Sequence, residues 1–172
     1  MSVIDDIQDE NLMLASRYDA RTGSLDQVPA RHIAVVGCMD GRLDLPAILG
    51  LQIGDAHVIR NAGGVATDDV IRSLVVSQRI LGTRAVMLVH HTGCGMLGFR
   101  DDELKAQIEQ ETGVRPPFAL EAFSDLDADV RQSVNRVRLS PYLPYRDEVR
   151  GFVFDTNSGR LREVYAGFSA GG

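Results

Sequence analysis

The chain has 172 residues, of which 44% are hydrophobic and 24% are charged, a balance typical of one compact globular domain. Its formal net charge of −6 argues against nucleic acid and anionic membranes as partners, because both attract an excess of lysine and arginine. No apolar run reaches the roughly 18 residues that span a bilayer, and residues 2–6 are acidic where a secretory signal is basic, so we expect one cytoplasmic domain over residues 1–172.

The first eighteen residues predict an amphipathic helix. Apolar residues recur there at helical spacing, and acidic residues stand between them: Asp5, Asp6, Asp9 and Glu10. Acidic groups in the early turns stabilise a helix because they face the positive end of its dipole. A connector follows, marked by Gly23 and Pro29.

Three short apolar runs predict buried strands, at residues 33–36, 56–59 and 85–89. Between the second and third runs, residues 67–69 can cap a helix that Gly82 ends. Buried strands separated by helical segments predict an α/β fold, with a mostly parallel central sheet flanked by helices.

The remaining elements change character toward the end of the chain. Residues 101–113 predict a charged helix, the prolines at 116–117 break the chain, and residues 121–139 predict another helix. Residues 151–165 then predict strand, turn and strand, because the turn residues at 156–159 tolerate positive φ. The fold should therefore close with a C-terminal β-hairpin.

The residues that carry chemistry follow two of the predicted strands. Cys38 ends the first strand, while the histidine pair His90 and His91 leads to Cys94 at the end of the third. Ligands of an open α/β sheet bind beyond the carboxyl ends of its strands. Two thiolates and one imidazole suit Zn²⁺, and three protein ligands leave the fourth position that a catalytic zinc keeps open. In a reducing compartment, two cysteines favour such a use over a disulfide framework.

The spacing of these residues in the sequence leaves several of their roles undecided. Asp40 lies close enough to Cys38 either to bind the ion or to accept a hydrogen bond from a zinc-bound water, and Arg42 could hold it in a charge-assisted pair. His90 and His91 compete for one role, because adjacent strand residues face opposite sides. Each residue alone also has a plain structural explanation, such as a cysteine that is a small buried hydrophobe. Their joint position at strand ends favours a site.

Two motifs resemble those of the β-class carbonic anhydrases. Residues 38–42, Cys-Met-Asp-Gly-Arg, match the family's Cys-x-Asp-x-Arg, and residues 91–94 match its His-x-x-Cys. Residues 54–63 look like the segment around the family's second strand, and the similarity runs from about residue 31 to 100. The N-terminal helix and the closing hairpin are similar to the compact bacterial branch that includes small mycobacterial enzymes.

The resemblance implies reversible, zinc-dependent hydration of carbon dioxide to bicarbonate through a zinc-bound hydroxide. Cys38, His91 and Cys94 would then be the zinc ligands. Asp40 and Arg42 would be the dyad that orients the hydroxide. The resemblance also implies a homodimer or a dimer of dimers, in which the N-terminal helix embraces a neighbouring subunit.

The sequence identifies fewer residues of the substrate pocket than of the metal site. Gln52 is similar in position to a family glutamine that binds bicarbonate, often across a subunit interface, and Gly63 and Gly64 of the glycine loop are further candidates for substrate contact. That loop by itself is equally a tight turn. Some members have a second, inhibitory bicarbonate site that uses a tryptophan, and this chain has no Trp, so that regulation is not expected.

Three alternatives remain. A carbonyl sulfide hydrolase would use the same zinc site and differ only in the pocket wall. A structural zinc module would need a fourth protein ligand, for which Asp40 is a candidate. A nucleotide-binding domain, suggested by the glycine loop at residues 61–64, is disfavoured because the full Gly-x-Gly-x-x-Gly pattern and a phosphate-binding lysine are missing.

Overall fold

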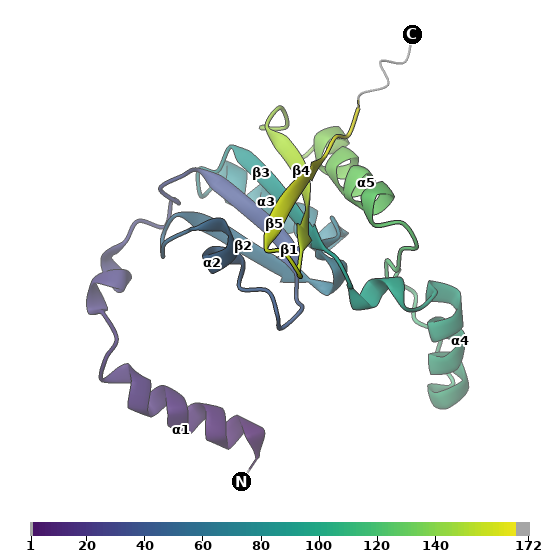
Figure 1. The fold of residues 1–172 in the computed structure, drawn as a ribbon, viewed down its shortest axis with the longest axis horizontal. Coiled ribbons are helices and arrows are strands. Elements are labelled where there is room, and N and C mark those ends of the chain that lie inside the picture. Colours follow the sequence, from purple (N-terminus) through teal and green to yellow (C-terminus); the bar gives the residue numbers. More distant parts are fainter. Residues whose placement is uncertain (1, 168–172) are drawn as a thin grey trace.

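A five-stranded sheet forms the centre of the computed structural model, which describes residues 2–167 (Figure 1). Its strands are β1 Ile33–Cys38, β2 Ala56–Asn61, β3 Ala85–His91, β4 Val149–Asp155 and β5 Arg160–Val164. Their order across the sheet is β2-β1-β3-β4-β5. The first four are parallel to their neighbours, and β5 returns antiparallel to β4. The predicted mostly parallel sheet with a closing hairpin is therefore confirmed.

Helices cover the two faces of the sheet unequally. They are α1 Val3–Ala15, α2 Leu45–Leu49, α3 Asp68–Arg79, α4 Asp101–Thr112 and α5 Leu126–Leu139, with short 3-10 turns at Ala20–Ser24, Ala62–Gly64 and Gly95–Leu97. Ala34 and Val36 of β1 share one buried cluster with α3 and α5. Val35 belongs to a second cluster on the other face, with α2 and the strand ends that carry the cysteines. The candidate site therefore lies against this second cluster.

Helix α5 approaches the sheet closely at one glycine. A Cβ on Gly151 of β4 would collide with the side chains of Val130 and Val134 of α5. Both valines are almost fully buried. The missing side chain thus lets the helix lie directly on the strand, which fixes the helix beside β3 and β4.

Local capping explains a helix that the apolar pattern did not predict. The Asp44 side chain accepts the N–H of Ala47, Pro46 lies in the first turn of α2, and Gly50 ends the helix in the left-handed conformation at φ 63°. These are start and stop signals of a helix only five residues long. Such a helix is too short to show an apolar period.

The predicted start of the last helix at residue 121 is wrong. Glu121 has a φ of 63°, outside the helical region, and its N–H donates to the carboxylate of Asp101 instead. Helix α5 begins at Leu126, where the Asp125 side chain caps it by accepting the N–H of Ala128. A long-range hydrogen bond therefore overrides the helical pattern of these residues.

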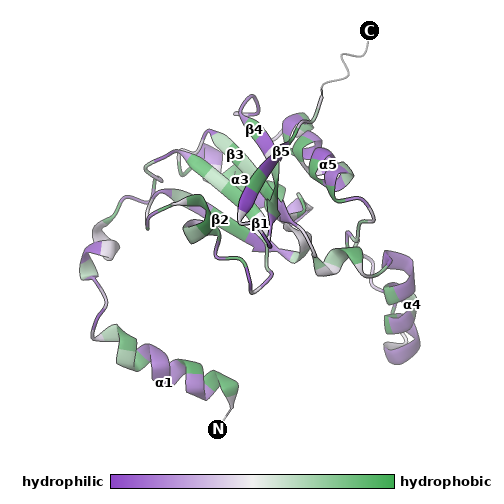
Figure 2. Ribbon diagram, in the orientation of Figure 1, coloured by the Kyte–Doolittle hydropathy of each residue, from purple (hydrophilic) through white to green (hydrophobic). Residues whose placement is uncertain are grey.

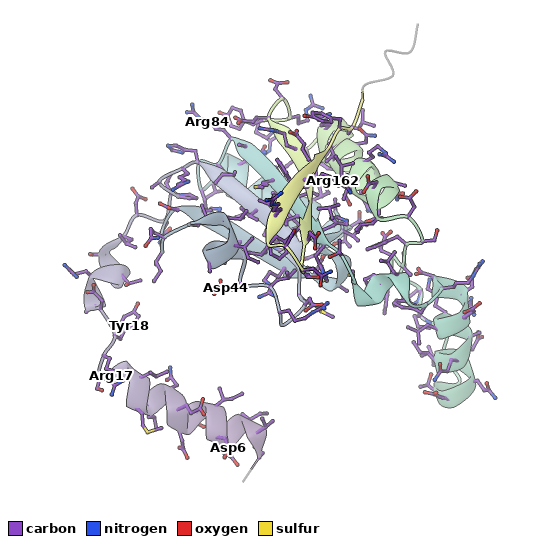
Figure 3. All side chains as sticks on the ribbon, in the orientation of Figure 1. Asp6, Arg17, Tyr18, Asp44, Arg84 and Arg162 are labelled. Carbon is purple, nitrogen blue, oxygen red and sulfur yellow. The ribbon has the colours of Figure 1, made fainter. Side chains whose placement is uncertain are left out.

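Helices α1 and α4 project from the body of the molecule (Figure 1), and neither has a buried residue. The Ser2 hydroxyl accepts the Asp5 N–H, and the Asp5 carboxylate accepts the Ser2 N–H, so a capping box starts α1. Apolar and polar residues alternate along this helix (Figure 2), and its side chains, Asp6 among them, extend into the surroundings (Figure 3). The predicted helix is confirmed, although it ends at Ala15. Within residues 2–167, none of the helices has the length and apolar character needed to cross a membrane.

Candidate metal centre

Three side chains meet where β1 and β3 end. The two strands are parallel neighbours, so Cys38, the last residue of β1, comes near His91 at the end of β3 and near Cys94 in the turn beyond it. One ligand atom from each of the three lies within 4.8 Å of the others, and all three residues are buried. The two sulfur atoms are 3.9 Å apart, far beyond the S–S bond length of roughly 2.05 Å, so both cysteines are free thiols.

The pleat of β3 separates the two adjacent histidines. His90 faces α5, where its Nε2 lies 2.7 Å from Oδ2 of Asp129. His91 faces the thiols, and its Nδ1 donates to the carbonyl oxygen of Thr92 at 3.0 Å. Its Nε2 is buried and has no hydrogen-bond partner among the described residues. The geometry therefore favours His91 as the third ligand.

This donor set fits a zinc ion. Two thiols and one imidazole nitrogen converge, and the nitrogen that faces the thiols lacks a hydrogen-bond partner among residues 2–167. The opposite ring nitrogen of His91 is held by a backbone carbonyl, which fixes the tautomer in which Nε2 carries the free lone pair. Sulfur and imidazole ligands of this number suit Zn²⁺ with one position left open.

The surroundings of Cys38 favour ionisation of its thiol. Burial opposes the charge on Cys38, but the neighbouring His91 and the backbone N–H groups of Asp40 and Gly63 outweigh burial and lower the pKa of Cys38 to about 7. Burial likewise disfavours a charge on His91, yet the Cys38 sulfur outweighs it and raises the pKa of His91. The first metal-binding thiolate is therefore available near neutral pH.

The second thiol is harder to ionise. Burial raises the pKa of Cys94 to about 11, although the backbone N–H of Met96 acts in the opposite direction. The negative charge of Cys38 contributes to this rise. A divalent cation stabilises both thiolates, so metal binding here should release protons.

Arg42 fixes a carboxylate beside the cluster. Its Nε donates to Oδ1 of Asp40 at 2.9 Å, and its Nη2 donates to Oδ2 at 2.7 Å. These bonds hold the pKa of Asp40 well below its usual range, so the group is an ionised acceptor. Asp40 Oδ2 lies 3.7 Å from His91 Nε2, and Arg42 also donates to the carbonyl of Gly93, which joins the two ligand-bearing loops.

Arg60 is a supporting residue that the sequence patterns did not single out. Its Nε donates to the carbonyl of Cys38 at 3.0 Å, and its Nη2 donates to the carbonyl of Asp40 at 2.7 Å. One guanidinium thus ties the turn that carries both residues to the end of β2. The resemblance to the family covers Arg60, but its spacing alone indicates no role.

The two glycines of the loop after β2 lie against the end of β1. The Gly63 N–H stabilises the Cys38 thiolate, as described above. A Cβ on Gly64, whose φ is 73°, would lie 2.9 Å from the backbone carbon of Gly37 and 3.0 Å from the nitrogen of Cys38. Only glycine allows both this conformation and this approach.

Gln52 lies apart from the cluster within the single chain. It is exposed, and its backbone N–H donates to Oδ2 of Asp55 at 2.9 Å. No hydrogen bond joins it to the cysteines, His91 or Asp40 in the part of the chain that the structure describes. The chain alone therefore does not bring Gln52 to the candidate site.

The chain is similar in sequence to a known family and to several known proteins. A sequence model of the carbonic anhydrase family matches residues 33–115. Beta-carbonic anhydrase 1 of Mycobacterium tuberculosis is 51% identical over 164 residues, which cover 95% of this chain and 99% of that protein. The chain belongs to the β-carbonic anhydrase family. It is therefore an enzyme of the lyase class, in line with the activity that the resemblance implied.

Other relatives define the breadth of this β-carbonic anhydrase group. The crystal structure of a carbonic anhydrase from Streptococcus mutans superposes with a TM-score of 0.85 at 37% identity, over 96% of this chain and 99% of that one. A carbon disulfide hydrolase from an Acidianus strain is 31% identical over 157 residues, 77% of each protein. The fold is thus shared by enzymes that are named for different substrates.

Proposed function

We propose that this β-carbonic anhydrase catalyses the reversible hydration of carbon dioxide to bicarbonate, with Zn²⁺ held by Cys38, His91 and Cys94. The supporting observation is the buried cluster itself, in which His91 Nε2 lacks a partner among the described residues and faces two thiols beside an oriented carboxylate. Zinc bound there would supply Lewis acidity, which lowers the pKa of water to about 7.

Asp40 orients the attacking water. Its Oδ2 is the carboxylate oxygen 3.7 Å from His91 Nε2, so it can accept a hydrogen bond from a water at the cluster and aim the water's lone pair at the carbon of the substrate. Arg42 holds both carboxylate oxygens and restrains Asp40 from becoming a fourth ligand, which is what a structural zinc module would require. Because the pKa of Asp40 is well below its usual range, this carboxylate is an acceptor rather than the base.

The glycine loop and Gln52 complete the proposed substrate site. We assign Gly63 and Gly64 to the wall of the substrate site through their backbone groups, since the Gly63 N–H faces the Cys38 sulfur. Gln52 is exposed in the single chain, so we assign its contact with bicarbonate to an assembled form in which a second subunit is present.

The assembly is proposed as a homodimer or a dimer of dimers. Apolar side chains of α1 are 60–72% exposed, among them Val3, Ile4, Ile7, Leu12, Met13 and Leu14. A helix with this many uncovered apolar groups is stabilised by an apolar surface on another subunit. Two free thiols 3.9 Å apart also suit a reducing compartment, so we propose a cytoplasmic location.

Carbonyl sulfide or carbon disulfide is the second candidate substrate. The 31% identical relative is named a carbon disulfide hydrolase, and carbonyl sulfide is isoelectronic with carbon dioxide. The 51% identical relative, named a carbonic anhydrase, favours carbon dioxide. Parallel assays with the three substrates on one zinc-loaded preparation separate these candidates.

Stopped-flow carbon dioxide hydration by protein of known zinc content tests the proposal. Cys38→Ser is the blank: it should lose zinc and hydration together, because one of three ligands is gone. Asp40→Asn and Arg42→Ala should keep one zinc per chain and lose most of the turnover, since they change only the orientation of the water. A fully active, zinc-free Cys94→Ser protein would contradict the assignment.

A further inference from the structure

The histidine that faces away from the cluster forms a buried pair of its own. His90 is 0% exposed, and its Nε2 lies 2.7 Å from Oδ2 of Asp129, which is 8% exposed in the first turn of α5. The His90 ring also packs beside Phe123, with ring centroids 5.7 Å apart. Its Nδ1 has no partner among residues 2–167, so Asp129 is the side chain that satisfies this imidazole there.

We propose that Asp129 is a positioning residue of the metal centre: through His90 it fixes the end of β3 and thereby the direction of His91. The inference rests on the zinc site proposed above, and it assigns to α5 a part in building that site. Asp129 touches neither the ligand atoms nor the substrate, so its effect passes through the strand.

Backbone pairing supports the end of β3 on one side only. The register between β1 and β3 runs from Ile33–Ala85 to Gly37–Val89, whereas that between β3 and β4 continues to His91–Phe154. The last two residues of β3 therefore lie beyond the paired part of β1. Asp129 provides a side-chain anchor at this place, from the helix that covers the opposite face.

The pleat transmits this anchor to the ligand. Consecutive strand residues point to opposite faces, so a rotation of the strand that moves His90 also swings His91. A charge-assisted bond of 2.7 Å between two buried groups restricts that rotation. Metal ligands must be held to within about 0.5 Å of their working geometry, so a small rotation of His91 away from the thiols weakens binding.

Removal of the carboxylate would release the anchor. His90 would then have no partner for either ring nitrogen, and a buried imidazole N–H without an acceptor is unfavourable. The ring would have to turn, or water would have to enter beside it, and either change shifts the strand end. Asparagine retains a side-chain oxygen at the same place, so it should preserve the bond.

Asp127 provides a matched control on the same turn of the same helix. Its carboxylate accepts two hydrogen bonds from Arg162 of β5, at 2.9 and 2.7 Å, and so anchors α5 to the hairpin. Its loss removes an anchor of α5 without touching His90. A purely structural role for Asp129 predicts that the two losses have similar consequences for the metal.

The test is the zinc dissociation constant of the full chain, measured by competition with a chelator, with cobalt(II) absorption as a check on thiolate ligation. Asp129→Leu, which keeps the branched shape and the number of heavy atoms of the side chain but has no hydrogen-bonding group, should weaken zinc binding by about tenfold or more, within the range known for groups that orient metal ligands. Asp129→Asn should stay within about threefold of the wild type. Asp127→Ala should bind zinc as the wild type does.

The outcomes separate the two proposals. A wild-type protein that binds no zinc contradicts the proposed function, whereas zinc binding that is normal in both the wild type and Asp129→Leu overturns the role of Asp129. Equal weakening in Asp127→Ala also overturns it, because the effect would then come from any loosening of α5. Thermal unfolding of the metal-free proteins establishes that each variant folds, and Asp129→Ala replaces the leucine variant if that one does not.

Discussion

The sheet and the N-terminal helix obtain their structure in different ways. In the sheet, Val36 and Leu88 are fully buried, and burial of such side chains drives folding. In α1, no residue is buried, and the capping box between Ser2 and Asp5 is a local interaction. A 13-residue helix with local support alone is marginal in water. The sheet is therefore complete within one chain, whereas the apolar side chains of α1 require another surface to cover them.

Helix α4 combines a feature of α1 with one of the sheet: it projects from the body, but long-range hydrogen bonds hold its start. It has no buried residue, yet Asp101 at its start accepts the backbone N–H groups of Leu120, Glu121 and Ala122 at 2.8, 3.2 and 2.8 Å. One carboxylate thus attaches the base of α4 to the segment that leads into α5. A helix can therefore project from the body and still be anchored at one end.

Deletion of residues 1–17 should have the largest effect on this comparison. We expect the dissociation constant of the proposed dimer to rise at least about 100-fold, since covering even two of the exposed apolar side chains of α1 contributes about 3 kcal/mol. Light scattering from about 0.1 to 100 μM checks the change in assembly. Zinc content serves as the control and should stay at that of the full chain, because all three candidate ligands lie outside the deleted segment. An unchanged dimer would show that α1 does not hold the subunits together.

A pair of truncations compares the two regions directly. Leu74→Ala, at a fully buried position of α3, should lower the free energy of unfolding by about 2–5 kcal/mol, because it leaves a cavity in the core. Ile7→Ala, at a position 61% exposed in α1, should change it by less than about 0.5 kcal/mol in the monomer. Urea denaturation at low protein concentration measures both. Similar losses at the two sites would contradict the distinction.

Acid should release the anchor of α4. Burial raises the pKa of Asp101, but the backbone N–H groups of residues 120–122 outweigh burial and leave the pKa below its usual value. A depressed folded-state pKa means that the stabilisation is complete above the unfolded value of about 3.9 and is lost as the pH falls through the lower, folded value. Asp101→Asn should cost about 1–2 kcal/mol at pH 7.

The measurement is the difference in unfolding free energy between the wild type and Asp101→Asn as a function of pH. This difference should be constant from about pH 5 to 7 and shrink in more acidic solution. A difference that grows on acidification would have the wrong sign for a carboxylate acceptor.

Loss of the α1 cap should have the smallest effect. Ser2→Ala removes the hydroxyl that accepts the Asp5 N–H, and should destabilise this helix by about 1 kcal/mol. Far-ultraviolet circular dichroism should show lower helicity, while the thermal midpoint of the body stays unchanged. A fall in that midpoint would indicate that α1 contributes to the core after all.

The sequence predicted the parts of this fold that depend on repeating patterns. Apolar runs located β1, β2 and β3, because strands buried on both faces are apolar throughout. The start of α5 was predicted wrongly, since nothing near Glu121 in the sequence shows that Asp101 will bind its N–H. Helix α2 was not predicted, although Asp44 and Gly50 are cap signals, because five residues carry no period.

The residues of the candidate site likewise divide into those that the sequence predicted and those that only the structure reveals. Motif spacing selected Cys38 and Cys94, and the strand pleat reduced the histidines to a choice between His90 and His91. Resemblance to the family favoured His91, and the structure places it against the thiols. The bonds that Arg60 makes to the ligand-bearing turn depend on how β2 lies beside β1, which is a tertiary property that spacing cannot reveal.

The two sulfur atoms that lie 3.9 Å apart belong to residues separated by 56 positions in the chain. A zinc ion bound there as proposed would act as a cross-link, and its stabilisation of the folded state would grow with the logarithm of its affinity. During synthesis, Cys38 leaves the ribosome well before Cys94, so the ion can be enclosed only after β3 has added to β1. A chain that holds the metal has therefore already paired β1 with β3 at the centre of the sheet.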